Sequence, residues 1–107
     1  MERHGQVIGL DEAGIAEYEA HHRAVPADVL ATIASCNIRN YTIFRHGTRL
    51  FAYFEYVGTD FDADMARMAA DPATRAWWDV VGPLQRPYPE RPEGAWWMEL
   101  PEVFHVD

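Results

Sequence analysis

The chain has 107 residues, of which 49% are apolar or aromatic and 24% are charged, and its formal net charge at pH 7 is −8. This composition is ordinary for a folded globular protein and argues against a disordered chain, and the length predicts one domain over residues 1–107. Because an acidic surface without a run of lysine and arginine repels phosphate groups, nucleic acid and membrane surfaces are not expected as partners.

The cysteine content gives an indication of the cellular compartment in which the protein works. Cys36 is the only cysteine, so no intramolecular disulfide can form, and the N-terminus lacks the apolar core of an export peptide. We therefore expect a cytoplasmic protein. Ser35 and Cys36 are the only evident nucleophile candidates and lie in no recognisable catalytic motif, so we interpret Cys36 as a packing residue.

The N-terminal third predicts a strand followed by a helix. Residues 6–10 are typical of a short strand, and Asp11 is a favourable N-cap for a helix. Tyr18 and His22 are four residues apart, so they share one face of that helix.

A second helix and a hairpin follow. Pro26 is predicted in the first turn of the second helix, which ends near Asn37. Residues 39–45 and 49–57 are rich in β-branched and aromatic side chains, and His46-Gly47-Thr48 between them has turn chemistry. This segment predicts a β-hairpin.

Two more helices come next. Thr59 or Asp60 can cap the first, and Asp71-Pro72 starts the second, which carries Trp77 and Trp78. The proline-rich residues 85–94 are expected to form an ordered loop.

A last strand is predicted over residues 96–105, with Trp96 and Trp97 on opposite faces, one in the core and one in a dimer interface. The order β, α, β, β, α, β is that of the ferredoxin-like split βαβ fold, an α+β class. Both alternating sets of residues 50–57 are largely apolar, which indicates that both sheet faces are covered. Since only one layer of helices is available, a second copy of the chain is expected to cover the other face.

Ring-bearing polar residues at separated places suggest a sugar pocket. An imidazole such as that of His22 exchanges a proton near neutral pH, which suits a general acid or base, although a partly exposed helical histidine is the alternative. Tyr18, Tyr41 and the pair Trp77-Trp78 offer flat apolar faces edged with hydrogen-bonding groups, but simple packing would also explain them. The five histidines lack metal-ligand spacing, so no metal is predicted.

Several segments, in order and spacing, resemble the L-rhamnose mutarotase family over essentially the whole chain. They are Glu17-Tyr18 with His22, Arg39 to Phe44, Leu50 to Glu55, Trp77-Trp78, and Glu102 to His105. The resemblance implies a dimeric α+β barrel that interconverts the anomers of a monosaccharide without a cofactor. It also implies that His22 is the catalytic proton donor and that Tyr18, Tyr41, Trp77 and Trp78 contact the sugar.

One segment departs from the family pattern. The family usually carries Trp-Pro-Glu where this chain has Pro26-Ala27-Asp28, which leaves L-fucose or another 6-deoxy hexose open beside L-rhamnose. The alternatives from other classes are a barrel of this type that only binds a small ligand and a cofactor-free oxygenase of the same architecture.

Overall fold

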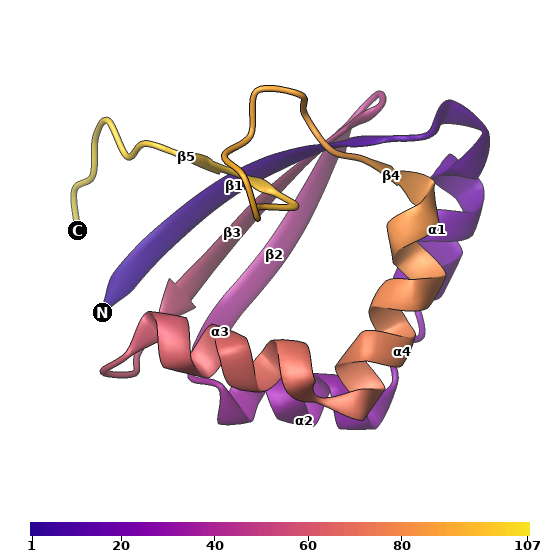
Figure 1. Ribbon diagram of the computed structural model, residues 1–107. Helices are drawn as coiled ribbons and strands as arrows, with labels where there is room; N and C mark the ends of the chain where they lie inside the picture. Colours follow the sequence, from indigo (N-terminus) through magenta and orange to yellow (C-terminus); the bar gives the residue numbers. More distant parts are fainter.

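The computed structural model describes all 107 residues (Figure 1). Its strands are β1 (Glu2–Leu10), β2 (Ile38–His46), β3 (Arg49–Tyr56), β4 (Gln85–Arg86) and β5 (Met98–Leu100). Its α-helices are α1 (Ile15–His22), α2 (Ala27–Ser35), α3 (Phe61–Ala70) and α4 (Pro72–Val81). Two 3₁₀ turns are η1 (Glu12–Gly14) and η2 (Gly82–Leu84).

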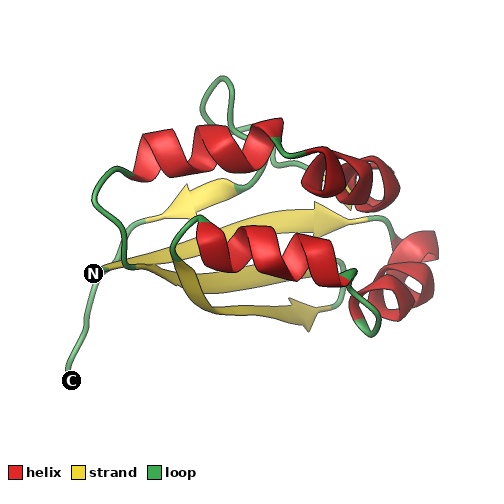
Figure 2. Ribbon diagram, turned by 90° about the horizontal axis from the view of Figure 1, so that it is seen from below, coloured by secondary structure: helices red, strands yellow, loops and turns green.

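The strands form one curled antiparallel sheet in the order β2-β3-β1-β4, with β5 also paired to β1. This is the order of a ferredoxin-like sheet, and the predicted α+β class is confirmed. The helices cover one face of the sheet, so the molecule is a half-barrel with its other sheet face bare (Figures 1 and 2). None of the helices has the length and apolarity needed to span a bilayer.

The first strand is longer than predicted, and the predicted N-cap is wrong. Strand β1 begins at Glu2 because β3 offers a partner along its whole length, out to Tyr56. The Asp11 side chain makes no cap bond. Its backbone N–H instead donates to the Leu84 carbonyl at 2.8 Å, and its carboxylate lies 3.5 Å from the Arg86 guanidinium. A 3₁₀ turn follows Asp11, and α1 is capped by Gly14.

The predicted hairpin and the predicted caps at Asp60 and Asp71 are confirmed, whereas Pro26 lies one residue before α2 rather than in its first turn. The Asp60 side chain accepts a hydrogen bond from the backbone of Ala63 at 3.1 Å, and that of Asp71 accepts one from Thr74 at 2.9 Å. These bonds satisfy N–H groups that have no partner inside a helix. Helix α2 ends just before Asn37, whose φ of 67° reverses the chain direction.

The predicted last strand over residues 96–105 is wrong, because regular pairing covers Met98–Leu100 alone. Pro101 has no N–H to extend the ladder. The edge of β1 is shared instead by two short strands, β4 near its end and β5 at its middle. Arg91 orders the loop between them, since its guanidinium donates to the carbonyl of Ala95 at 2.7 Å and to that of Tyr88 at 2.9 Å.

Two apolar clusters hold the helices on the sheet. The first cluster lies under α1 and α4, and its buried members are Ile8, Leu10, Tyr18, Leu50 and Val81. The second lies under α2 and α3, and its buried members are Ile38, Phe54 and Tyr56. Cys36 is fully buried, as its interpretation as a packing residue requires. Asp64 ties α3 to the sheet by accepting hydrogen bonds from the Tyr56 hydroxyl at 2.5 Å and from Asn37 at 2.9 Å. Its bond from Tyr56 is the main reason that the pKa of this carboxyl falls to about 2.

Candidate functional site

A large cavity of about 1460 Å³ lies between the sheet and the helices and is bordered by members of both core clusters. The structure brings all five predicted site residues to this one cavity: Tyr18, His22, Tyr41, Trp77 and Trp78. They come from α1, β2 and α4, which are far apart in the sequence. The cavity lining is largely apolar, with a few polar groups, which is typical of small-molecule sites.

The imidazole of His22 is fixed by its own helix. Its Nδ1 lies 2.8 Å from the backbone oxygen of Tyr18, one turn earlier. A carbonyl only accepts hydrogen bonds, so Nδ1 carries a proton and Nε2 is the atom left to exchange one. The ring stacks on Tyr18 with centroids 4.2 Å apart, and Trp77 meets it edge-on at 5.1 Å.

Burial sets the charge state of His22. Desolvation lowers the pKa of this imidazole, the hydrogen bond to the Tyr18 backbone opposes that shift, and the nearby His21 adds slightly to it. His22 is therefore a neutral base at neutral pH, with a lone pair on Nε2. His21 instead pairs with Glu17, at 3.3 Å across one helix turn.

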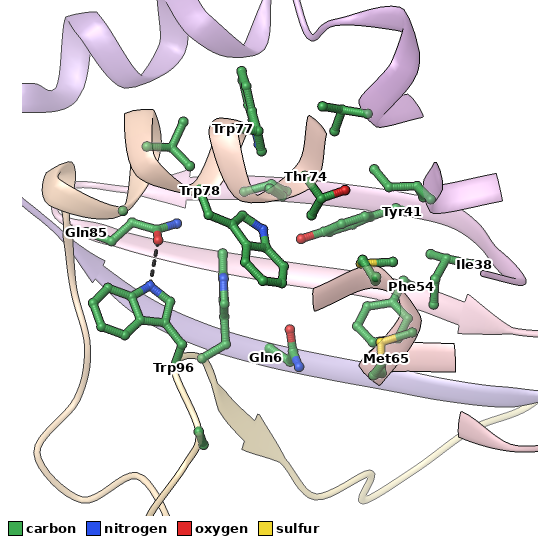
Figure 3. A pocket seen from close by; sticks show the side chains of 18 of the residues that line it. Gln6, Ile38, Tyr41, Phe54, Met65, Thr74, Trp77, Trp78, Gln85 and Trp96 are labelled. Atoms are coloured by element: carbon green, nitrogen blue, oxygen red, sulfur yellow. Dashed lines mark hydrogen bonds between the residues drawn. The ribbon is translucent and has the colours of Figure 1, made fainter. Parts of the chain in front are cut away.

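The Tyr18 side chain is almost completely buried, and its hydroxyl is hydrogen-bonded. It is 3% exposed, and the side-chain N–H of Gln85 donates to its hydroxyl at 3.3 Å. Desolvation raises the pKa of Tyr18, and the bond from Gln85 opposes the shift. The Gln85 oxygen in turn accepts a bond from the Trp96 indole at 2.7 Å (Figure 3). Because Gln85 supplies a proton to the Tyr18 oxygen, the phenol's own proton remains available to a ligand.

Tyr41 reaches the cavity because β2 contains a bulge. The pairing with β3 shifts between Arg39 and Thr42, and Asn40 has a φ of 52°. The extra residue changes which side of the strand faces inward, so Ile38, Tyr41 and Ile43 all border the cavity. The Asn40 amide also donates to Glu55 at 2.8 Å, which holds the bulge.

The hydroxyl of Tyr41 keeps its proton. The residue is 42% exposed, and its ring lies inside the cavity with protein on several sides (Figure 3). Desolvation, with a smaller contribution from Tyr18, raises its pKa to about 12. Tyr41 is thus a hydrogen-bond donor across the physiological pH range.

The tryptophan pair divides between two environments, as adjacent helical positions must. Trp77 packs against the core cluster and His22, whereas Trp78 extends into the cavity towards Tyr41 (Figure 3). Trp78 is 45% exposed and offers its indole face to a ligand.

Sequence reasoning missed several residues of the cavity, among them three with hydrogen-bonding side chains. Gln6, Gln85 and Trp96 all border it. Trp96 does so because it precedes β5, so the predicted placement of Trp96 and Trp97 on opposite faces of a strand is wrong; both border the cavity. For Gln85 the sequence held no signal beyond a polar residue beside a proline-rich loop.

Comparison with known proteins decides between the interpretations of this site. The model of the L-rhamnose mutarotase family matches residues 3–106. The chain belongs to the L-rhamnose mutarotase family. An L-rhamnose mutarotase of Opitutus terrae is 32% identical over 108 residues, with all of both chains covered. An L-fucose mutarotase of Xanthomonas campestris is 36% identical over 110 residues, covering 97% of this chain and 87% of that one.

The fold has solved counterparts that span the whole chain. A crystal structure of an L-rhamnose mutarotase from Formosa agariphila superposes with a TM-score of 0.79 at 19% identity, and covers all of both chains. A tetracenomycin F2 cyclase from Streptomyces glaucescens gives a TM-score of 0.72 at 16% identity. The family identifies the protein as a carbohydrate isomerase that interconverts the anomers of L-rhamnose or a related sugar. A binding-only barrel or an oxygenase is not favoured.

Proposed function

We propose that His22 is the acid–base catalyst of anomer interconversion, and that the substrate is L-rhamnose or a related 6-deoxy hexose such as L-fucose. The observation that carries this proposal is the fixed orientation of the His22 imidazole. Its Nδ1 is held by the Tyr18 backbone, and the ring borders the cavity with its free nitrogen unpaired. A neutral base with one free nitrogen suits proton removal from the anomeric hydroxyl.

The reaction needs two proton movements. Nε2 of His22 takes the proton from the anomeric hydroxyl while the bond between C1 and the ring oxygen breaks and the ring oxygen gains a proton. Tyr41, whose phenol is protonated before the reaction because its pKa is about 12, supplies that proton directly or through a water molecule and regains it when the ring closes. The open aldehyde turns about its C1–C2 bond, and the reverse steps close the ring on the other face. No electrons leave the sugar, so we expect no cofactor.

The other predicted site residues bind the sugar in this proposal. The exposed indole of Trp78 stacks on the apolar C–H face of the ring, Trp77 supports His22, and the hydroxyls of Tyr18 and Tyr41 hold sugar hydroxyls. Asp62, Asp79 and Glu99 border the cavity, and no lysine or arginine does. This charge pattern favours a neutral sugar over a phosphorylated one.

The identity of the sugar depends on the segment that departs from the family pattern. Pro26 caps α2 and lies at the surface, while Val25 and Val29 on either side border the cavity. The side chains at this border are small, which leaves room for a 6-deoxy hexose other than L-rhamnose.

We further propose that the protein acts as a cytoplasmic homodimer of the single domain 1–107, without nucleic-acid or membrane partners. The bare sheet face supports the dimer, because a row of cross-strand neighbours on it is apolar from edge to edge. The row consists of Phe44, Phe51, Val7 and Met98, on β2, β3, β1 and β5. Phe44 and Phe51 are exposed, whereas the small Val7 is already buried in the single chain. The charge of −8 and the lone cysteine support the other expectations.

The test measures exchange between the two anomer signals by NMR, with and without protein, for L-rhamnose, L-fucose, L-galactose and D-glucose. We expect added exchange with at least one 6-deoxy sugar. His22→Ala abolishes that added exchange and leaves the melting temperature near that of the wild type. His21→Ala is the matched control, because His21 pairs with Glu17, and it keeps the activity. Full activity in His22→Ala would contradict the assigned role.

A further inference from the structure

A polar side chain, that of Gln6, stands on the sheet wall of the cavity. The inward positions of β1 are His4, Gln6, Ile8 and Leu10, and the last two are core residues. Gln6 borders the cavity, and Figure 3 shows its side chain reaching up from the sheet towards the space beneath Trp78.

The orientation of the Gln6 amide is determined by chemistry. Its Nε2 lies 3.0 Å from Oε2 of Glu99, the residue paired with it on β5. A carboxylate only accepts hydrogen bonds, so the amide must present its nitrogen to Glu99. Its oxygen Oε1 is thereby turned towards the cavity, where it is an acceptor without a protein partner.

Glu99 is itself held in place. Its other oxygen contacts Nδ1 of His4 at 2.5 Å, while Nε2 of His4 lies 3.0 Å from Glu2. The His4 ring packs against two neighbouring phenyl rings, with its centroid 4.8 Å from that of Phe54 and 4.4 Å from that of Phe61. A ring packed against two phenyl rings and bonded at both nitrogens has little freedom to turn, so this chain of contacts orients the Gln6 oxygen before a ligand arrives.

We propose that Gln6 is a sugar-binding residue whose Oε1 accepts a hydrogen bond from a substrate hydroxyl, and that Glu99 and His4 are positioning residues for it. The inference rests on the proposed sugar substrate. It adds a recognition point on the sheet wall, separate from the residues on α1 and α4. Oε1 can stabilise only a bound sugar that has a hydroxyl pointing towards it. A sugar whose hydroxyl at that carbon points elsewhere loses this hydrogen bond, so Gln6 contributes to selectivity among epimers.

The first experiment compares Gln6→Leu with the wild type. Loss of one hydrogen bond to a neutral group predicts a Kd for the sugar that is about three- to tenfold higher, measured by NMR titration. The rate of anomer exchange at saturating sugar stays within about twofold of the wild-type rate. Gln6→Met gives the same result if the leucine variant disturbs packing, and the melting temperature reports on the fold. Glu102→Gln is the control, since Glu102 pairs with Arg3 away from the cavity.

The second experiment separates positioning from general stability. In Glu99→Gln the new amide has one oxygen for two donors, so either Gln6 or His4 loses its partner. Glu99→Gln alone raises Kd, whereas in the Gln6→Leu background it has no further effect, because a positioning residue acts through Gln6. Glu99→Asp, which retains two acceptor oxygens, restores part of the affinity.

A series of monodeoxy sugars identifies the hydroxyl. The affinity loss caused by Gln6→Leu disappears for the one deoxy sugar that lacks the hydroxyl read by Gln6. If the wild type exchanges anomers and Gln6→Leu binds every sugar as tightly as the wild type, the role of Gln6 is overturned and the mutarotase activity stands. If the wild type binds none of the sugars, both proposals fail.

Discussion

His22 acts in a charge state that its surroundings impose. Burial opposes the imidazolium, and the Tyr18 carbonyl fixes the remaining proton on Nδ1. A histidine at an open helix surface would be partly charged near its ordinary pKa of 6.5. In this protein the lone pair of Nε2 is retained as the solution becomes mildly acidic.

The enzyme-catalysed exchange rate should therefore persist below pH 6.5. Protonation of His22 removes the base, so the acidic limb of the profile has its midpoint below that value. The stability of the fold should change with pH in the same direction. Below pH 6.5 His22 in the unfolded chain binds a proton, whereas His22 in the folded chain stays neutral. The contribution of His22 to the free energy of unfolding is therefore lost as the pH falls through the lowered pKa. NMR exchange rates, corrected for the uncatalysed reaction at each pH, give the midpoint. A midpoint above 6.5 would contradict this account.

At the scale of elements, the bulge in β2 decides what the cavity contains. In a regular strand, residues 38, 40 and 42 would share the inward side, and Tyr41 would face outward. The left-handed conformation of Asn40 moves Tyr41 inward. Asparagine is one of the few side chains that tolerate this conformation, which costs most other residues about 1–2 kcal/mol.

Two substitutions of Asn40 should distinguish the effect of the bulge conformation from the effect of the Asn40 side chain. Asn40→Gly keeps the left-handed conformation, and we expect exchange within about threefold of the wild type. Asn40→Val favours a regular strand and turns Tyr41 out of the cavity, which should lower exchange by roughly 10²-fold, the cost of misplacing a substrate-positioning group. NMR exchange and the melting temperature are measured for both variants. Equal activity in the two would show that the bulge does not position Tyr41.

At the scale of the whole molecule, the half-barrel has one covered face and one bare face. Phe44 is 63% exposed although it belongs to an apolar row that crosses the sheet. Beyond β5 the chain runs away from the body of the fold and exposes Val103, Phe104 and Val106 (Figure 2). Arg3 holds the start of this tail through Glu102. A sheet-to-sheet contact with a second copy would cover the apolar row.

A charge placed in that row should prevent the contact. The wild type is expected at twice the chain mass of 12.3 kDa in light scattering after gel filtration. Phe44→Glu should move the mass to that of one chain while the far-ultraviolet circular dichroism is unchanged, because the side chain packs against little in a single copy. Val80→Glu alters an exposed apolar residue on α4, away from the row, and should leave the mass unchanged. A wild type of single-chain mass would contradict the dimer.

Local patterns in the sequence predicted much of this fold. The caps at Asp60 and Asp71, the hairpin turn at Gly47 and the four-residue spacing of Tyr18 and His22 depend on interactions within one or two turns of chain, and all are present. The failures lie where distant segments compete. Asp11 is drawn to Leu84 and Arg86 rather than to its own helix, and the last strand is limited by which part of β1 is free to pair.

The amino-acid sequence by itself determined the order of the four helices and the first three strands, the acidic surface and the set of aromatic and imidazole groups from which a sugar site could be built. The tertiary structure alone decided which nitrogen of His22 is free, that Tyr41 turns inward, and that Gln6, Gln85 and Trp96 join the cavity. Side-chain direction at a bulge, the depth of burial and hydrogen bonds between strands all depend on contacts across long stretches of chain, and spacing along the sequence does not encode them.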